Sequence, residues 1–83
     1  MISNPGSYHY PRELYLEIQN NPHLLGRLTL VKGESCFHVE VDLVFEESKK
    51  IYRHIASLFN QLEEQEAIDL AMQSFAKFLR GQS

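Results

Sequence analysis

Apolar and polar residues alternate most regularly in the middle of the chain. From residue 36 to residue 45, one set of alternate positions is apolar and consists of Phe37, Val39, Val41, Leu43 and Phe45. The interleaved set is mostly polar and consists of Cys36, His38, Glu40, Asp42 and Val44. Successive side chains point to opposite faces of a strand, so this period of two predicts a strand with one buried face.

A strand is also predicted near the start of the chain. From Glu13 onward, leucines and an isoleucine alternate with polar or aromatic residues, which predicts a strand over residues 12–19. The same segment fits a helix with Pro11 in its first turn. The alternation is unbroken and Tyr10 is a poor helix cap, so we favour the strand.

The segment between these two strands predicts a third one. Over residues 25–31, Leu28 and Leu30 face one side and polar residues face the other. Turn-forming residues occupy positions 20–23 and 32–35. Three consecutive strands with short connections predict an antiparallel meander.

After Glu46 the apolar residues recur about every 3.6 residues instead of every second residue, and this spacing is typical of helices. A first helical stripe is formed by Ile51, Ile55, Leu58 and Phe59. A second stripe is formed by Ile68, Ala71, Met72, Phe75, Phe78 and Leu79. Acidic residues lie near the start of the second stripe and basic residues lie at its end. This order stabilises a helix, whose dipole is positive at the N-terminal end and negative at the C-terminal end. The pattern predicts two helices, with a single kinked helix as the alternative.

Together these patterns predict an α+β fold. A three-stranded antiparallel meander is followed by two C-terminal amphipathic helices packed on one sheet face. The 83 residues suffice for one core, so we expect a single domain over residues 1–83. Residues 1–11 contain two prolines and a glycine and are expected to form a flexible lead-in.

Composition excludes several classes of protein. The chain has one cysteine, so it cannot form an internal disulfide. A net charge of −3 provides no overall positive field for non-specific nucleic-acid binding. The longest apolar runs span three residues, whereas a membrane helix needs about 20. We expect a cytoplasmic protein without membrane contact, in which association replaces the stabilisation that disulfides give to other small domains.

The sheet face that the helices leave uncovered carries more apolar residues than contact with water requires. Its candidate contact residues are Tyr15, Leu25, Val31 and Val44. A meander of three strands also has two unpaired edges. Both features favour association with another protein or with a second copy, so we predict a homodimer.

A small basic cluster supports an alternative function. Lys49, Lys50 and Arg53 share the solvated face of the first predicted helix and could contact a phosphate backbone. Glu46 lies four residues before Lys50 and offsets part of this charge. Nucleic-acid binding is therefore the second hypothesis.

Motifs for catalysis or metal binding are weak. Cys36 and His38 lie on one side of the central strand and could supply two metal ligands, but a structural zinc site needs four. The four histidines are scattered, and the sequence contains no nucleophile elbow or phosphate-binding loop. A small enzyme or metal-binding protein is the third hypothesis. We predict a non-enzymatic protein-interaction or regulatory module without a cofactor.

Overall fold

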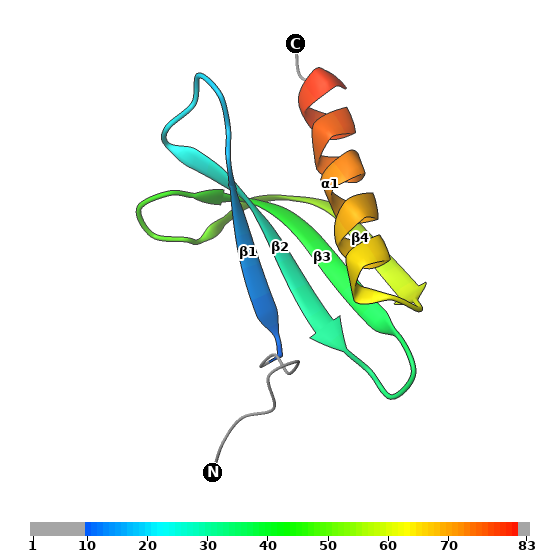
Figure 1. Cartoon of the computed structure of the whole chain (residues 1–83). Coiled ribbons are helices and arrows are strands. Elements are labelled where there is room, and N and C mark those ends of the chain that lie inside the picture. The colour runs from blue at the N-terminus through cyan, green and yellow to red at the C-terminus, as the bar shows by residue number, and fades with distance from the viewer. Residues whose placement is uncertain (1–9, 82–83) are drawn as a thin grey trace.

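The computed structural model describes residues 10–81, which form an antiparallel sheet and one helix (Figure 1). The elements are β1 (Arg12–Glu17), β2 (Leu24–Lys32), β3 (Phe37–Phe45), β4 (Ile51–Gln61) and α1 (Glu64–Gly81). Each strand pairs with the next along the chain, so the sheet order is β1-β2-β3-β4. The α+β class and the three predicted strands are confirmed. Residues 1–9 of the expected lead-in lie outside the described residues.

The first predicted helix is wrong, because residues 51–61 form β4. Three irregularities interrupt the register between β3 and β4. One of them inserts Ile55 between His54, which pairs with Asp42, and Ala56, which pairs with Val41. An inserted residue shifts the alternation by one position. The apolar residues of this bulged strand therefore recur at the intervals of three and four that indicate a helix.

The second predicted helix is confirmed, and it is the only helix among residues 10–81. Glu64 and Glu66 lie in its first turn and Arg80 in its last, the order that the helix dipole favours. Its buried face consists of Ala67, Ala71 and Phe75. Met72, which the sequence pattern assigns to the buried stripe, is 45% exposed.

The core lies between α1 and one face of the sheet, where the helix packs mainly on β3 and β4 (Figure 1). Its buried members are Leu28, Leu30, Val39, Val41, Leu43, Ala67, Ala71 and Phe75. Two alanines on the helix let its backbone approach the sheet closely. The start of α1 is tied to the region of β1, because Glu64 Oε2 accepts hydrogen bonds from Arg12 (3.0 Å) and Tyr10 (2.8 Å).

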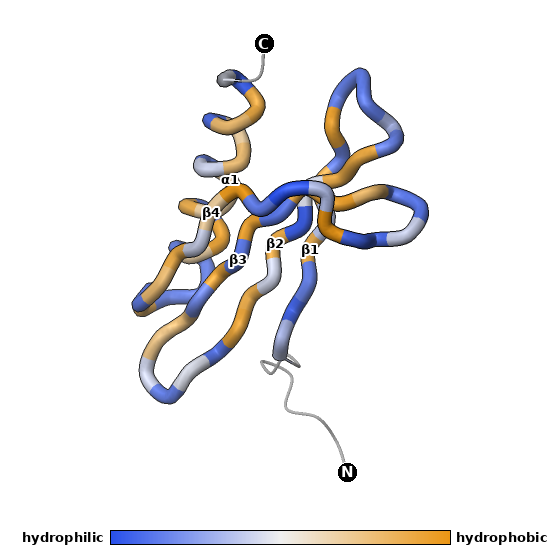
Figure 2. Tube along the Cα trace, turned by 180° about the vertical axis from the view of Figure 1, so that it is seen from behind, coloured by the Kyte–Doolittle hydropathy of each residue, from blue (hydrophilic) through white to orange (hydrophobic). Residues whose placement is uncertain are grey.

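The loop between β3 and β4 folds over the other face of the sheet. In Figure 2, which views the side away from α1, residues 46–50 lie in front of the ends of β1 and β2. The Glu46 amide donates to the His23 carbonyl (2.8 Å), and the Lys49 carbonyl accepts from Arg27 (3.4 Å). Val44, near the end of β3, is fully buried although it points away from the helix.

Gly26 provides the space that Phe75 occupies above β2. A Cβ atom at position 26 would lie 2.7 and 2.8 Å from the Cε atoms of Phe75. We expect Gly26→Ala to lower the free energy of unfolding by about 1–3 kcal/mol, because the ring must leave its position. Urea unfolding followed by circular dichroism measures this change.

Gly81→Ala is the matched control, since a Cβ there meets nothing within 4 Å. Its effect should stay within about 0.5 kcal/mol. In a Phe75→Leu background, Gly26→Ala should cost less than in the wild type. An equal cost in both backgrounds would show that the Phe75 contact is not the cause.

Candidate functional site on the open sheet face

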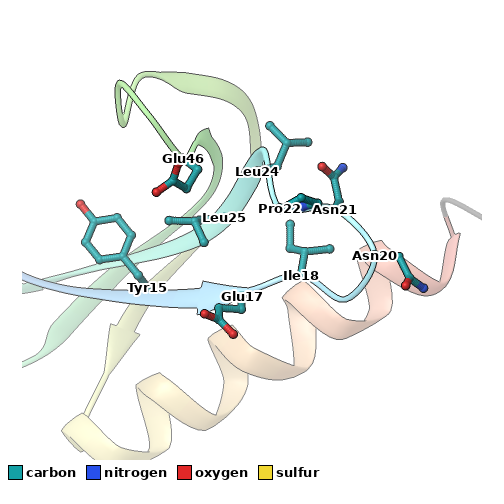
Figure 3. A pocket seen from close by; sticks show the side chains of 9 residues that line it. All are labelled: Tyr15, Glu17, Ile18, Asn20, Asn21, Pro22, Leu24, Leu25 and Glu46. Atoms are coloured by element: carbon teal, nitrogen blue, oxygen red, sulfur yellow. The ribbon is translucent and has the colours of Figure 1, made fainter.

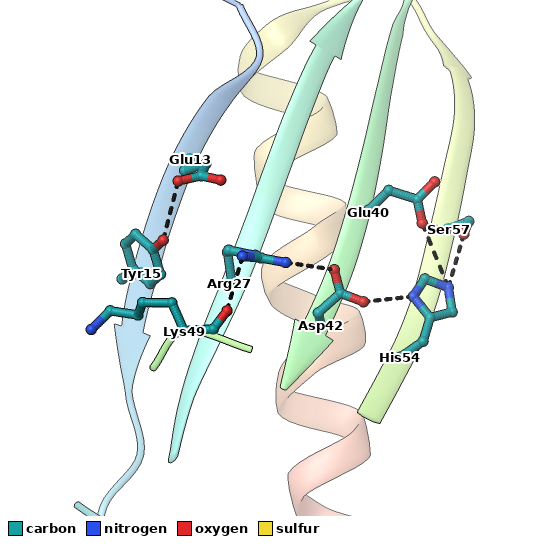
Figure 4. A network of polar contacts seen from close by, with 8 residues as sticks. All are labelled: Glu13, Tyr15, Arg27, Glu40, Asp42, Lys49, His54 and Ser57. Atoms are coloured by element: carbon teal, nitrogen blue, oxygen red, sulfur yellow. Dashed lines mark hydrogen bonds and ion pairs between the residues drawn. The ribbon is translucent and has the colours of Figure 1, made fainter. Parts of the chain in front are cut away.

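The sheet face turned away from α1, called the open face here, carries two neighbouring rows of mostly polar side chains. The antiparallel register aligns the first row as Tyr15, Arg27, Asp42 and His54. It aligns the second as Glu13, Thr29, Glu40 and Ser57. Each row takes one residue from every strand, and residues directly opposite each other interact across an antiparallel pair. Figure 4 shows most of these residues, which we call the polar belt.

Asp42 is the centre of the belt and is only 4% exposed. Its carboxylate lies 2.8 Å from Nδ1 of His54 on β4 and 3.9 Å from Nη2 of Arg27 on β2 (Figure 4). A buried carboxylate is costly unless positive charge or hydrogen bonds compensate it. Partners on both neighbouring strands supply that compensation. Arg27 Nε is itself buried and has no hydrogen-bond partner among residues 10–81.

A second chain of hydrogen bonds connects the two carboxylates of β3. Ser57 donates to Glu40 (2.6 Å), and Nε2 of His54 lies 3.0 Å from the Ser57 hydroxyl oxygen. His38 also contacts the Glu40 carboxylate, and its ring stacks on Phe59 with 4.3 Å between centroids. Burial raises the pKa of Glu40, but the bonds from Ser57 and His38 and the charges of both histidines outweigh it. The net pKa is below the ordinary value of 4.5.

Asp42, His54 and Ser57 lie in the order acid, imidazole and hydroxyl that nucleophilic serine sites use. Here the Ser57 hydroxyl donates to Glu40, so its proton is not directed at His54. The two ring nitrogens of His54 lie beside the Asp42 carboxylate and the Ser57 hydroxyl oxygen. Ser57 also lines neither the cavity beside the β1–β2 turn nor the one beside the β3–β4 loop. In this arrangement the belt places counter-charges and hydrogen bonds around the two carboxylates of β3.

The four predicted contact residues of the uncovered face all lie on the open face. Tyr15 is 41% exposed and Val31 is 37% exposed, whereas Leu25 is partly buried. Val44 is fully buried and is out of reach of a partner in this conformation. The role of Tyr15, Leu25 and Val31 in partner binding stays a prediction.

The predicted basic helix face is wrong, because no helix forms there. Lys49 and Lys50 lie in the loop before β4. Arg53 is paired with Leu43 on the helix side of the sheet, where its guanidinium lies 5.3 Å from the ring centroid of Phe78. The three cations are thus divided between two faces, and no observation favours nucleic-acid binding over association with a protein.

The structure gives Cys36 and His38 different neighbours. The Cys36 thiol lies 3.8 Å from the side-chain oxygen of Asn60, whereas His38 contacts Glu40 and Phe59. Within residues 10–81, no group of three or more histidine, cysteine or acidic side chains is arranged to hold a metal ion.

Sequence reasoning missed the polar belt as a unit. Glu40 and Asp42 were visible as alternate residues of one strand, but His54 and Ser57 were assigned to a helix. The signal that could have placed them is the composition of residues 51–59, which is rich in β-branched and aromatic side chains.

Comparisons with protein-family models, with curated proteins and with solved structures found no match to this chain. In the part of the chain that the structure describes, no helix has the length and hydropathy needed to cross a membrane.

Loss of the Asp42 charge should destabilise the fold. We expect Asp42→Asn to lower the free energy of unfolding by about 3 kcal/mol, because the largely buried Arg27 loses its counter-charge. Arg27→Met should recover part of this loss when added to Asp42→Asn, as chemical denaturation can measure. Glu13→Gln on the same face is the control and should cost less than about 0.5 kcal/mol. An equal loss from both single acid substitutions would contradict this role of Asp42.

The lowered pKa of Glu40 predicts a pH-dependent contribution to stability. A carboxylate with a lower pKa in the folded state stabilises the protein above its unfolded pKa. This contribution disappears as the pH falls through the folded value. The difference in thermal midpoint between wild type and Glu40→Gln should therefore be largest near pH 5–6 and shrink steadily below about pH 4.5. A difference that is independent of pH from 6 to 3 would contradict the assignment.

Proposed function

We propose that this protein is a non-enzymatic protein-interaction module that self-associates through the open face. The observation that carries the proposal is the asymmetry of the sheet, because α1 covers only one of its faces. On and around the polar belt, the open face exposes Tyr15, Val31, Ile51 and Phe59, at 41, 37, 56 and 57%. Two sheets that pack face to face bury such side chains, and the dimer would form a helix–sheet–sheet–helix sandwich.

The sheet edges are poorer candidates for association than the open face. β4 is long, but its three register irregularities bend it away from the regular geometry that another strand requires. β1 has only six residues, among them Arg12, Glu13 and Glu17. Charged residues and short length both protect an edge strand from pairing. These features favour the open face as the surface that a partner contacts.

The charges of the open face suit a second copy of the chain. Glu13 and Glu17 lie at its β1 border, and His54 lies at its β4 border. A two-fold axis along the strands would place β1 of one protomer opposite β4 of its partner, so Glu13 and Glu17 would lie one row to either side of the partner's His54. Such a self-complementary patch is typical of homodimers. The small core also supports association, because only nine apolar side chains are buried among residues 10–81.

Light scattering coupled to size-exclusion chromatography tests the proposal. The wild type should elute with twice the monomer mass of 9.7 kDa at about 100 µM protein. Val31→Glu and Phe59→Glu should each raise the dimer dissociation constant by at least about tenfold, because each places a carboxylate in the contact.

Met72→Glu is the matched control, since Met72 is similarly exposed but lies on α1. It should leave the mass unchanged. Circular dichroism must show that all three variants keep the fold. A folded wild type that remains monomeric at several hundred micromolar rules out self-association.

A further inference from the structure

Glu40 is a carboxylate of the open face that depends on histidines for positive charge. One of its oxygens contacts Nε2 of His38. The other oxygen lies 3.6 Å from Nε2 of His54 and accepts the hydrogen bond from Ser57. Within residues 10–81, no lysine or arginine forms an ion pair with Glu40. A full counter-charge for Glu40 therefore exists only when one of the two histidines is protonated.

Both histidines lie where a second copy of the chain would contact the open face. The side chain of His54 is 50% exposed, and those of His38 and Glu40 are each 32% exposed. The His38 ring stacks on Phe59, which is one of the proposed contact residues. Association would remove water from Glu40, and a carboxylate that has neither water nor a counter-charge is costly. Protonated histidines supply that counter-charge.

The open face is acidic as long as its histidines are neutral. Its strands carry four carboxylates and one guanidinium, which belong to Glu13, Glu17, Glu40, Asp42 and Arg27. The loop over residues 46–50 adds two acids and two lysines, which balance each other. Figure 3 shows Glu46 of this loop beside Tyr15. In the part of the chain that the structure describes, the face thus has a charge of −3, which becomes −1 when both of its histidines are protonated.

Two copies that pack through the same face bring equal charges together. They repel each other at −3 per face, and this repulsion is much smaller at −1. In the proposed two-fold arrangement, Glu13 and Glu17 attract the partner's His54 only while that histidine is charged. Histidine ordinarily changes its charge between pH 8 and pH 5.5, whereas carboxylates keep theirs. Glu40 stays ionised in this range, since its pKa lies below 4.5.

On the basis of the proposed self-association, we infer that dimer formation is coupled to proton uptake by His38 and His54, so that mildly acidic pH favours the dimer. Protons that bind more tightly to the dimer than to the monomer shift the equilibrium toward the dimer as the pH falls. A decrease from about pH 8 to about pH 5.5 should lower the dimer dissociation constant by at least about tenfold.

Sedimentation equilibrium at constant ionic strength measures this dissociation constant at both pH values. In the double variant His38→Gln with His54→Gln, the change between the two pH values should shrink to less than about twofold, because glutamine does not titrate. Circular dichroism must show that the double variant keeps the fold. An equal pH dependence in the folded double variant and in the wild type would overturn the inference.

His23→Gln is the matched control. His23 is exposed in the β1–β2 turn, and no ion pair within residues 10–81 involves it. Its substitution removes one titrating imidazole but should leave the tenfold change in place. The control therefore separates proton uptake in the polar belt from the general loss of net charge near the isoelectric point of about 5.7. Loss of the pH dependence in His23→Gln would overturn the assignment to His38 and His54.

Glu40→Gln tests the role of the carboxylate between the two histidines. Near pH 8 this variant should associate at least about threefold more tightly than the wild type, because no unpaired charge is covered. Its dissociation constant should also depend less on pH. Association near pH 8 that is no tighter than that of the wild type would contradict this role of Glu40.

Failure of the coupling and failure of the proposed function give different results. A wild type that dimerises equally at both pH values keeps the proposed self-association and overturns its coupling to protons. A wild type that is monomeric at both pH values at several hundred micromolar overturns both proposals. Acid-dependent association that survives Val31→Glu and Phe59→Glu would place the contact outside the open face and would also overturn both.

Discussion

The close contact between one helix and a four-stranded sheet is the constraint on which the rest of the structure depends. Ala67 and Ala71 let α1 approach the sheet, and Phe75 fits into the space that Gly26 leaves on β2. This contact buries the apolar face of β2 and β3 and contributes most of the hydrophobic free energy available to a chain of this size. A single helix covers only one face of the sheet. The side chains of the other face must therefore be buried or paired by different means.

The open face does so in two ways. The β3–β4 loop folds back and forms hydrogen bonds with His23 and Arg27, while the polar belt compensates the buried Asp42 with groups from β2 and β4. Because Asp42 needs both partners, any change of register between β2, β3 and β4 would leave a carboxylate buried without its counter-charges. We therefore expect the belt to favour the observed strand register. The apolar residues around the belt stay exposed, and this exposure motivates the proposed self-association.

Much of the fold was predictable from local pattern, and most of the candidate site was not. Strict alternation identified β3, and the helical stripe with its ordered charges identified α1. β4 was missed because a bulge at Ile55 disturbs its alternation, and His54 was placed on the wrong element for the same reason. The apposition of Asp42 with His54 then had no basis in the sequence pattern.

The sequence by itself determined which side chains face the core in β2, β3 and most of α1. Residues that face the core recur at every second position in a strand and about every 3.6 positions in a helix. It also determined that the chain is acidic and lacks an internal disulfide. Only the tertiary structure decided that residues 51–61 form a fourth strand, that the loop before this strand folds onto the open face and that Lys49, Lys50 and Arg53 do not form one surface. These outcomes depend on register and on contacts between distant segments, which periodicity within one segment does not encode.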